Sequence, residues 1–201
     1  YVLNFIRLRK YIFFKRYPHY DFMPHIKAAM VFFAMTVATT VYTNLDTVML
    51  GFMSGNAEVG YYNAAVKVKQ ILVSLVTSLG AVLLPRLSYY VQSDRREQFY
   101  RVVVKAMRIV FFLAIPLMVF FMMFAEEVIL ILSGEAYLAA VQPMQIIMPT
   151  LLFIGITNLL GLQIMVPMGQ ERLVVISVVA GGILDLILNA VLIPGYGASG
   201  A

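Results

Sequence analysis

Long segments without charged side chains are the feature that most constrains this chain. No charged residue occurs from Ala136 to Gln170, and two other charge-free runs extend over 28–45 and 109–125. Hydrophobic residues make up 62% of the chain and charged residues 12%, whereas soluble domains average about 45–50% and about 25%. A chain with so little charge cannot cover a surface that faces water, so it needs lipid as its solvent. The sequence therefore predicts an all-α integral membrane protein built as a polytopic helical bundle.

The apolar runs divide at charges and turn residues into about five transmembrane helices. A spanning helix needs about 20 mostly apolar residues. We expect residues 1–27 to form a basic cytoplasmic linker, because Pro18 and Pro24 oppose a long helix there. Because the chain lacks an initiator Met and ends directly after a predicted helix, we expect it to be an internal part of a longer polypeptide. Residues 28–201 are then one transmembrane lobe, incomplete at its C-terminus, with helices at about 28–53, 63–90, 106–132, 141–168 and 173–193.

The basic residues predict the orientation of these helices. Of the 15 Lys and Arg residues, all but Lys67 and Lys69 fall in 1–27, in 86–108 or at Arg172. These are alternate loops of a five-helix topology, so they lie on one side of the membrane. Basic loops favour the cytoplasmic side. We therefore expect the N-terminal segment in the cytoplasm, and the charge excess needs no nucleic-acid partner to explain it.

The residue types argue against an enzyme and against a bound metal or cofactor. The chain has no cysteine, which removes thiol nucleophiles and cysteine-ligated zinc. Its two histidines, His19 and His25, lie in the basic linker without the spacing of a zinc site. No nucleophile elbow, phosphate-binding loop or dinucleotide fingerprint occurs.

Polar side chains recur at helical spacing inside the predicted spans. Threonines including Thr43 share a face of the first span, and Asp46 and Asp185 are carboxylates within the first and fifth spans. The main candidate substrate path is a stripe on the second span, formed by Asn63, Lys67, Gln70, Ser74, Thr77 and Ser78.

Each of these features has a purely structural alternative. Hydroxyl stripes also occur where helices pack closely or where side chains bond back to their own helix. Asp46 and Lys67 lie toward helix ends, so snorkelling or a plain ion pair would explain them. Asp185 would then pair with a cation outside this chain. Charges are costly in lipid, so Asp46, Lys67 and Asp185 should face either a cavity or a partner.

Several segments, taken in order, resemble the polysaccharide-biosynthesis flippases. They are Leu45-Asp46-Thr47-Val48-Met49-Leu50-Gly51-Phe52, Glu58-Val59-Gly60-Tyr61-Tyr62-Asn63-Ala64-Ala65 with Lys67, Leu84-Pro85-Arg86-Leu87-Ser88, and Asn189 to Ala201 with its Leu-Ile-Pro-Gly-Tyr-Gly core. The sequence over about 40–201 is similar to O-antigen-type lipid-linked oligosaccharide flippases of the multidrug/oligosaccharidyl-lipid/polysaccharide (MOP) superfamily. The resemblance implies the C-terminal lobe of a two-lobe MATE-like transporter, lacking its N-terminal lobe and last helix.

The resemblance also implies a function. The chain would belong to a transporter that flips an undecaprenyl-pyrophosphate-linked oligosaccharide across the bacterial cytoplasmic membrane for surface polysaccharide assembly. Lys67 and its polar neighbours would attract the sugar–pyrophosphate head, and Asp46 or Asp185 would carry a coupling H+ or Na+. Its partners would be the bilayer, the lipid-linked oligosaccharide, the missing lobe, and a polysaccharide polymerase and glycosyltransferases.

Other functions fit the same pattern. A MATE-type cation-coupled multidrug exporter would use Asp46 and Asp185 in preference to Lys67. A lipid II flippase would share the two-lobe plan. A membrane scaffold without transport would need the polar stripes only for packing.

Overall fold

The structure, a computed structural model, describes residues 22–78 and 80–201. Most of the predicted linker 1–27 lies outside these residues. The chain divides into two compact units, 1–37 and 38–201. The second unit holds all the features discussed below, and helix α2 (Met23–Met53) contributes its C-terminal part to it.

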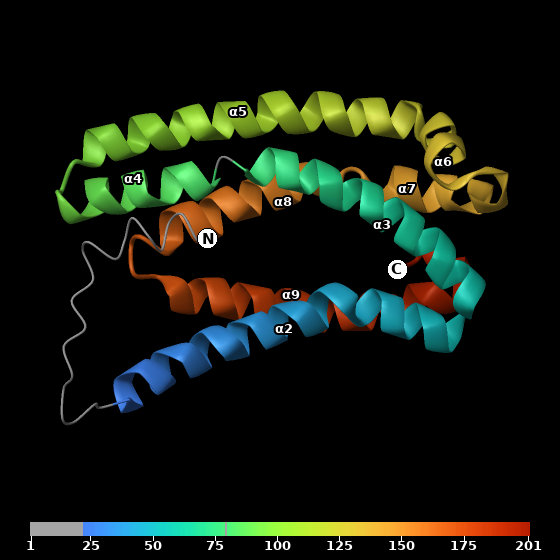
Figure 1. The fold of residues 1–201 in the computed structure, drawn as a ribbon, viewed down its shortest axis with the longest axis horizontal. Helices are drawn as coiled ribbons and strands as arrows, with labels where there is room; N and C mark the ends of the chain where they lie inside the picture. The colour runs from blue at the N-terminus through green and yellow to red at the C-terminus, as the bar shows by residue number, and fades with distance from the viewer. Residues whose placement is uncertain (1–21, 79) are drawn as a thin grey trace, which may run out of the picture. The chain divides into compact units, whose positions relative to one another are not determined.

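The described residues are predominantly helical and contain no strand, as the apolar runs predict. After α2 come α3 (Asn56–Thr77), α4 (Gly80–Gln92), α5 (Arg96–Met123), α6 (Ala125–Ser133) and the 3-10 helix η1 (Glu135–Ala140). They are followed by α7 (Val141–Ile147), α8 (Thr150–Asn158), the π-helix η2 (Leu159–Met165), α9 (Glu171–Tyr196) and the 3-10 helix η3 (Gly197–Ser199) (Figure 1). The chain is thus an all-α polytopic membrane protein.

The helix bounds depart from the predicted spans in three places. Helix α2 begins at Met23 and not at 28, because a proline is tolerated in the first helical turn, where the backbone N–H has no intrahelical partner. The span predicted at 63–90 begins at Asn56 and is divided into α3 and α4, with their axes 41° apart. The span predicted at 141–168 is bent by 48° between α7 and α8, where Pro149 precedes α8.

Two described helices are long and apolar enough to cross a membrane on their own. They are 96–123, which is α5, and 171–199, which contains α9. The two bent pairs raise the number to four if each pair forms one span. The sequence predicts five spans, so the described residues account for two to four of them by length and composition.

A continuous apolar core holds the second unit together. Helix α3 contacts α7 and α8, α5 contacts α8, and α4 contacts the π-helix η2. The buried side chains at these contacts include Leu72 and Val76 of α3, Val110 of α5 and Met144 of α7. Large apolar side chains on the outer faces are exposed instead, for example Phe112 and Ile176. Outward apolar faces around a packed interior are what a helical bundle in lipid requires.

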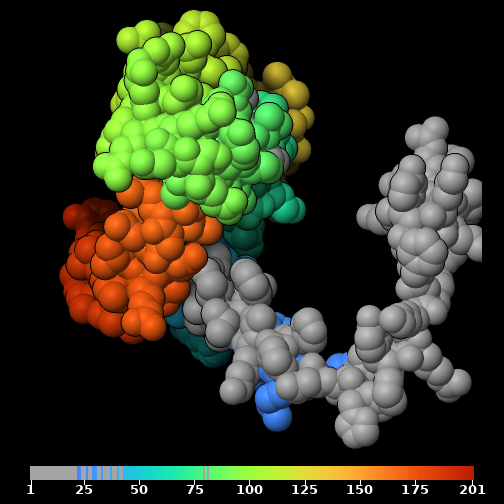
Figure 2. All heavy atoms as spheres, turned by 90° about the vertical axis from the view of Figure 1, so that its left-hand side faces the viewer, coloured from blue at the N-terminus to red at the C-terminus, as the bar shows by residue number. Residues whose placement is uncertain are grey.

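The turns with basic residues meet at one end of this unit. The α4–α5 turn carries the exposed Arg95 and Arg96, and a surface hollow there is lined by Tyr90 and Tyr100 together with Met168 from the turn before α9. Figure 2 shows these two turns side by side. They therefore share an end, as the predicted topology requires.

Candidate functional site: a carboxylate cluster and a lysine-lined hollow

The first candidate site is a hydrogen-bonded cluster that joins α2, α3 and α9. Tyr62 donates its hydroxyl hydrogen to Asp46 Oδ2, with an O–O distance of 2.6 Å. Asn189 Nδ2 donates to Asp46 Oδ1 at 2.8 Å and lies 3.4 Å from Asp185 Oδ2. Tyr62 and Asn189 are buried, and the two carboxylates are partly buried. The arrangement brings Asp46 and Asp185 together although they are far apart in the sequence.

A lysine supplies the opposite charge to this cluster. Lys69 is partly buried, and Asp46 and Asp185 both act electrostatically on its ammonium group. A carboxylate pair away from bulk water needs such a cation, because desolvated charges are costly without a partner. Lys67, by contrast, is exposed on another face of α3. The lysine that interacts electrostatically with Asp46 and Asp185 is therefore Lys69, on a different face of α3 from Lys67.

The second candidate site is an open hollow around Lys67. Its lining includes Gly60, Asn63 and Lys67 of α3, with Ser133 and Tyr137 from the opposite segment. Its volume is about 530 Å³, within the range of small-molecule pockets. The Tyr137 ring meets Tyr61 edge-on at 6.0 Å and remains 37% exposed. Two residues of the predicted substrate path, Asn63 and Lys67, thus line the same hollow.

The rest of the predicted path continues along α3 with its hydroxyls turned to their own helix. Ser74 donates to the Ile71 carbonyl at 2.7 Å, and Thr77 to the Val73 carbonyl at 2.8 Å. Ser78 does the same at Leu75, also at 2.8 Å. This is the back-bonding that the structural alternative describes. Gln70 and Ser74 are exposed, so their face is available to a partner or a cavity.

Thr43, the first-span residue of the predicted path, makes hydrogen bonds within its own helix. Its hydroxyl donates to the Thr40 carbonyl at 3.3 Å, and it accepts a hydrogen bond of 3.4 Å from Asn44 Nδ2. Its place in a substrate path remains a prediction. Among the described residues, no group of three or more His, Cys, Asp or Glu could hold a metal ion.

Comparison with known proteins identifies the family. Residues 12–142 match the family described as "Polysaccharide biosynthesis protein". The chain belongs to this family. No solved structure matches the chain significantly.

Curated relatives of this family carry transporter and flippase names. A "Putative O-antigen transporter" of Shigella dysenteriae is 26% identical over 87% of the chain and 43% of its own length. A protein of the same name from Escherichia coli (strain K12) is 26% identical over 78% of the chain and 37% of its length. The "Probable low-salt glycan biosynthesis flippase Agl15" of Haloferax volcanii is 22% identical over 80% and 34%. The chain spans well under half the length of these relatives, whose names describe transport and not catalysis.

Two residues of the first site, Tyr62 and Lys69, were not predicted from the sequence. Tyr62 and Lys69 lie seven positions apart, so both fall on nearly the same side of α3. That side also carries the buried Ala65, Leu72 and Val76, and a lysine within an apolar helical face is a signal of a buried ionic partner. The polar stripe on α3 favoured Lys67 instead, because the residues beside it at helical spacing carry hydroxyls and amides.

Proposed function

We propose that this chain is one lobe of a family transporter that flips a lipid-linked oligosaccharide across a membrane. The observation that carries the proposal is the hollow that places Lys67, Asn63 and Tyr137 together. The names of the curated relatives support it. The proposed cargo is an undecaprenyl-pyrophosphate-linked oligosaccharide, and the proposed location is the bacterial cytoplasmic membrane with residues 1–27 in the cytoplasm.

The chemistry of the hollow suits a sugar–pyrophosphate head. A lysine ammonium attracts phosphate oxygens as a compact point charge. The Asn63 amide both donates and accepts hydrogen bonds, so it can pair with sugar hydroxyls. The exposed Tyr137 ring offers an apolar face with a polar tip. The polyprenyl tail would stay in lipid beside the apolar outer helix faces.

The carboxylate cluster is the proposed place for coupling to H+ or Na+. Asp46 and Asp185 share the Asn189 amide and face the Lys69 cation. Loading a proton or a sodium ion there changes the charge balance with Lys69, which biases how α2, α3 and α9 pack. This gives a cation a way to favour one conformation of the lobe over another.

The chain would act with a second lobe of the same polypeptide. Gln70 and Ser74 form an exposed polar face on α3, and such a face needs a partner lobe to enclose a wet path within the bilayer. A polysaccharide polymerase and glycosyltransferases are the proposed functional partners. This chain expressed alone should not restore surface polysaccharide to cells that lack the transporter.

Substitution of Lys67 in the full-length protein tests the proposal. Lys67→Ala should abolish restoration of surface polysaccharide at normal protein level, and Lys67→Arg should retain part of it because the charge persists. Lys105→Ala on the exposed face of α5 is the matched control and should transport normally. Full activity of Lys67→Ala would show that the hollow does not bind the cargo.

The carboxylate pair supports a second candidate, export of a cationic drug. Such a site would use Asp46 and Asp185 to bind the cation, and Lys69 would oppose it. Efflux of a cationic dye by the full-length protein, lost in Asp46→Asn, would favour this function over the flippase. Loss of polysaccharide restoration without dye efflux would favour the flippase.

A further inference from the structure

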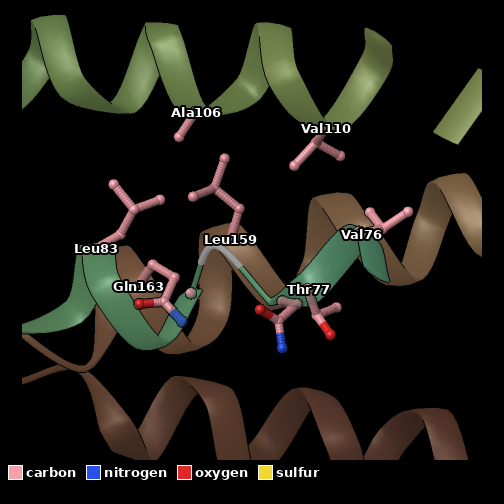
Figure 3. A pocket seen from close by; sticks show the side chains of 10 residues that line it. Val76, Thr77, Leu83, Ala106, Val110, Leu159 and Gln163 are labelled. Atoms are coloured by element: carbon pink, nitrogen blue, oxygen red, sulfur yellow. The ribbon is translucent and has the colours of Figure 1, made fainter. Parts of the chain in front are cut away.

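A surface hollow beside the α4–α5 turn takes no part in the proposed function. Its volume is about 270 Å³, just below the range of about 300–1,000 Å³ for small-molecule pockets. Its lining includes the apolar Phe99 and Met168 and the polar Tyr90, Arg96 and Tyr100. The small pocket in Figure 3, by contrast, has a volume of about 10 Å³, which leaves room for about one water molecule. The hollow at the turn therefore has space for a small amphipathic group.

Two hydrogen-bonded turns hold the rim of this hollow in place. After α4, the Arg95 N–H donates to the Tyr90 carbonyl at 2.9 Å, and Asp94 adopts the left-handed conformation with a φ of 50°. The turn before α9 repeats this pattern. Gln170 makes a backbone hydrogen bond of 2.9 Å to the last residue of η2, and Gly169 has a φ of 71°. Both turns thus resemble a Schellman motif, which fixes the path of the chain after a helix.

The hollow lies where two membrane-spanning segments begin. Arg96 is the first residue of α5, and Met168 comes three positions before the segment 171–199. Helix α5 has 28 residues, which corresponds to about 42 Å, whereas the hydrocarbon core of a bilayer is about 30 Å thick. All charged residues of α5 lie between 96 and 108, so the excess length falls at this end. The hollow is therefore placed at the level of the lipid headgroups, where tyrosines are also enriched.

The surroundings of the hollow are positively charged. Residues 86–108 contain six basic and two acidic side chains, which gives a formal net charge of +4. Arg86 and Arg95 lie over the rings of Tyr90 and Tyr89, with their guanidinium carbons 5.7 and 5.6 Å from the ring centres. Such cation–π contacts hold the two charges beside the hollow. An anion is therefore attracted to this place and a cation is repelled.

Two side chains in the lining have hydrogen-bond donors to offer an anion. Arg96 Nε donates to Asp94 Oδ1 at 3.0 Å, and this bond leaves the N–H groups of the two terminal nitrogens for a ligand. The Arg96 side chain is 84% exposed, so a ligand can reach them. The Tyr90 hydroxyl oxygen accepts from Arg86 Nε at 3.0 Å, so its own hydrogen can be donated. Phosphate oxygens accept hydrogen bonds from both kinds of donor.

We propose that this hollow binds the headgroup of an anionic glycerophospholipid such as phosphatidylglycerol. Arg96 and the Tyr90 hydroxyl bind the phosphate, and the Tyr100 hydroxyl bonds to the headgroup glycerol. Phe99 and Met168 contact the glycerol backbone and the first methylenes of the acyl chains, which continue into the hydrocarbon. A headgroup that carries an ammonium is disfavoured by the surrounding positive charge. The inference does not depend on the cargo that the transporter moves.

Lipid titration of the full-length protein in a neutral detergent tests the proposal. Native mass spectrometry measures the affinity for the first bound phosphatidylglycerol. Arg96→Gln should weaken this affinity about tenfold or more, the factor for one charge-assisted hydrogen bond. Arg108→Gln is the matched control, because it removes the same charge from an exposed site about 18 Å further along α5. Exposed charges beyond about 10 Å are largely screened, so this control should bind normally. Equal weakening by both variants would indicate diffuse attraction to a charged surface and would overturn the site.

Further arms of the titration locate the lipid and identify it. Met168→Trp fills the hollow without changing the charge, so it should also weaken binding of phosphatidylglycerol. Full affinity in that variant would place the lipid elsewhere. Phosphatidylcholine should bind more weakly and should respond little to Arg96→Gln, and equal behaviour of the two lipids would contradict headgroup recognition. Inorganic phosphate that binds as tightly as phosphatidylglycerol would identify a free-phosphate site and would exclude the lipid assignment.

Discussion

The Tyr62 hydroxyl lies 2.6 Å from Asp46 Oδ2 and ties α3 to the C-terminal part of α2. The other oxygen of the same carboxylate accepts from Asn189 of α9. One side chain thus connects the consecutive helices α2 and α3 to α9, which is distant from them in sequence. In a bilayer, where helices gain little from hydrophobic association, such hydrogen bonds contribute to helix pairing.

Tyr62→Phe removes this bond without changing the ring. We expect a loss of about 1.5–3 kcal/mol in stability, the usual range for a hydrogen bond to a charged group. The measurement is thermal unfolding of the purified protein in detergent. Tyr100→Phe is the control, because Tyr100 is 65% exposed. Equal midpoints for both variants would mean that the bond does not stabilise the fold.

Lys69→Ala should destabilise the protein more than Lys67→Ala does. Removal of the partly buried Lys69 leaves Asp46 and Asp185 without their cation, whereas Lys67 is exposed. Protein level in membranes and the unfolding midpoint measure this difference. The triple variant Lys69→Ala with Asp46→Asn and Asp185→Asn should recover part of the lost stability. A stable Lys69→Ala protein would contradict the electrostatic role.

Gly155→Ala should be destabilising because the site has no room for a methyl group. A Cβ there would lie 2.8 Å from Val110 Cγ1 and 2.9 Å from Val76 Cγ1, both buried. Overpacking of this kind costs about 1–3 kcal/mol. Gly181→Ala in α9 is the control, since nothing lies within 4 Å of its Cβ position. The same unfolding assay should show Gly181→Ala to be neutral or slightly stabilising.

Glu58→Ala should release the segment after α9. Glu58 Oε2 accepts a hydrogen bond of 2.7 Å from the Ala198 N–H, which fixes Gly197–Ser199 against the first turn of α3. Exchange of the Ala198 amide hydrogen should become faster in Glu58→Ala. Glu58→Gln keeps an acceptor oxygen and should have a smaller effect. Unchanged exchange in both variants would show that the segment is held by other contacts.

The orientation predicted from the basic residues can be tested by cysteine labelling. The chain has no cysteine, so a single introduced cysteine is the only residue of this chain that the thiol reagent can label. In intact cells, a cysteine at Ser93 or Gly169 should resist an impermeant thiol reagent, and one at Gly55 or Tyr137 should react. The reverse pattern would invert the topology.

The helical class and the family were predictable from sequence because they depend on local properties. Charge-free runs and helical periodicity need no tertiary contact to be recognised. The 41° angle between α3 and α4 was not predictable in this way, because α4 packs against the distant π-helix η2. Its partner is identified only when the chain folds.

The candidate sites likewise contain some features that follow from local spacing and some that depend on tertiary contacts. Asn63 and Lys67 share a face of one helix, so their proximity follows from spacing. Tyr137 joins them only through the fold. The contact between Asp46 and Asn189 is equally non-local, and the assignment of Lys69 to the carboxylates requires knowing which side of α3 faces α2 and α9.

The inward-turned hydroxyls of Ser74, Thr77 and Ser78 have a consequence for any glycan that passes this face. With their hydrogens committed to the helix backbone, these oxygens offer lone pairs and no donors. Sugar hydroxyls can each give a hydrogen to such a surface, whatever their stereochemistry. A surface that offers only acceptors binds a sugar weakly and discriminates poorly between epimers. If a glycan is the cargo, other residues would have to provide the specificity for it.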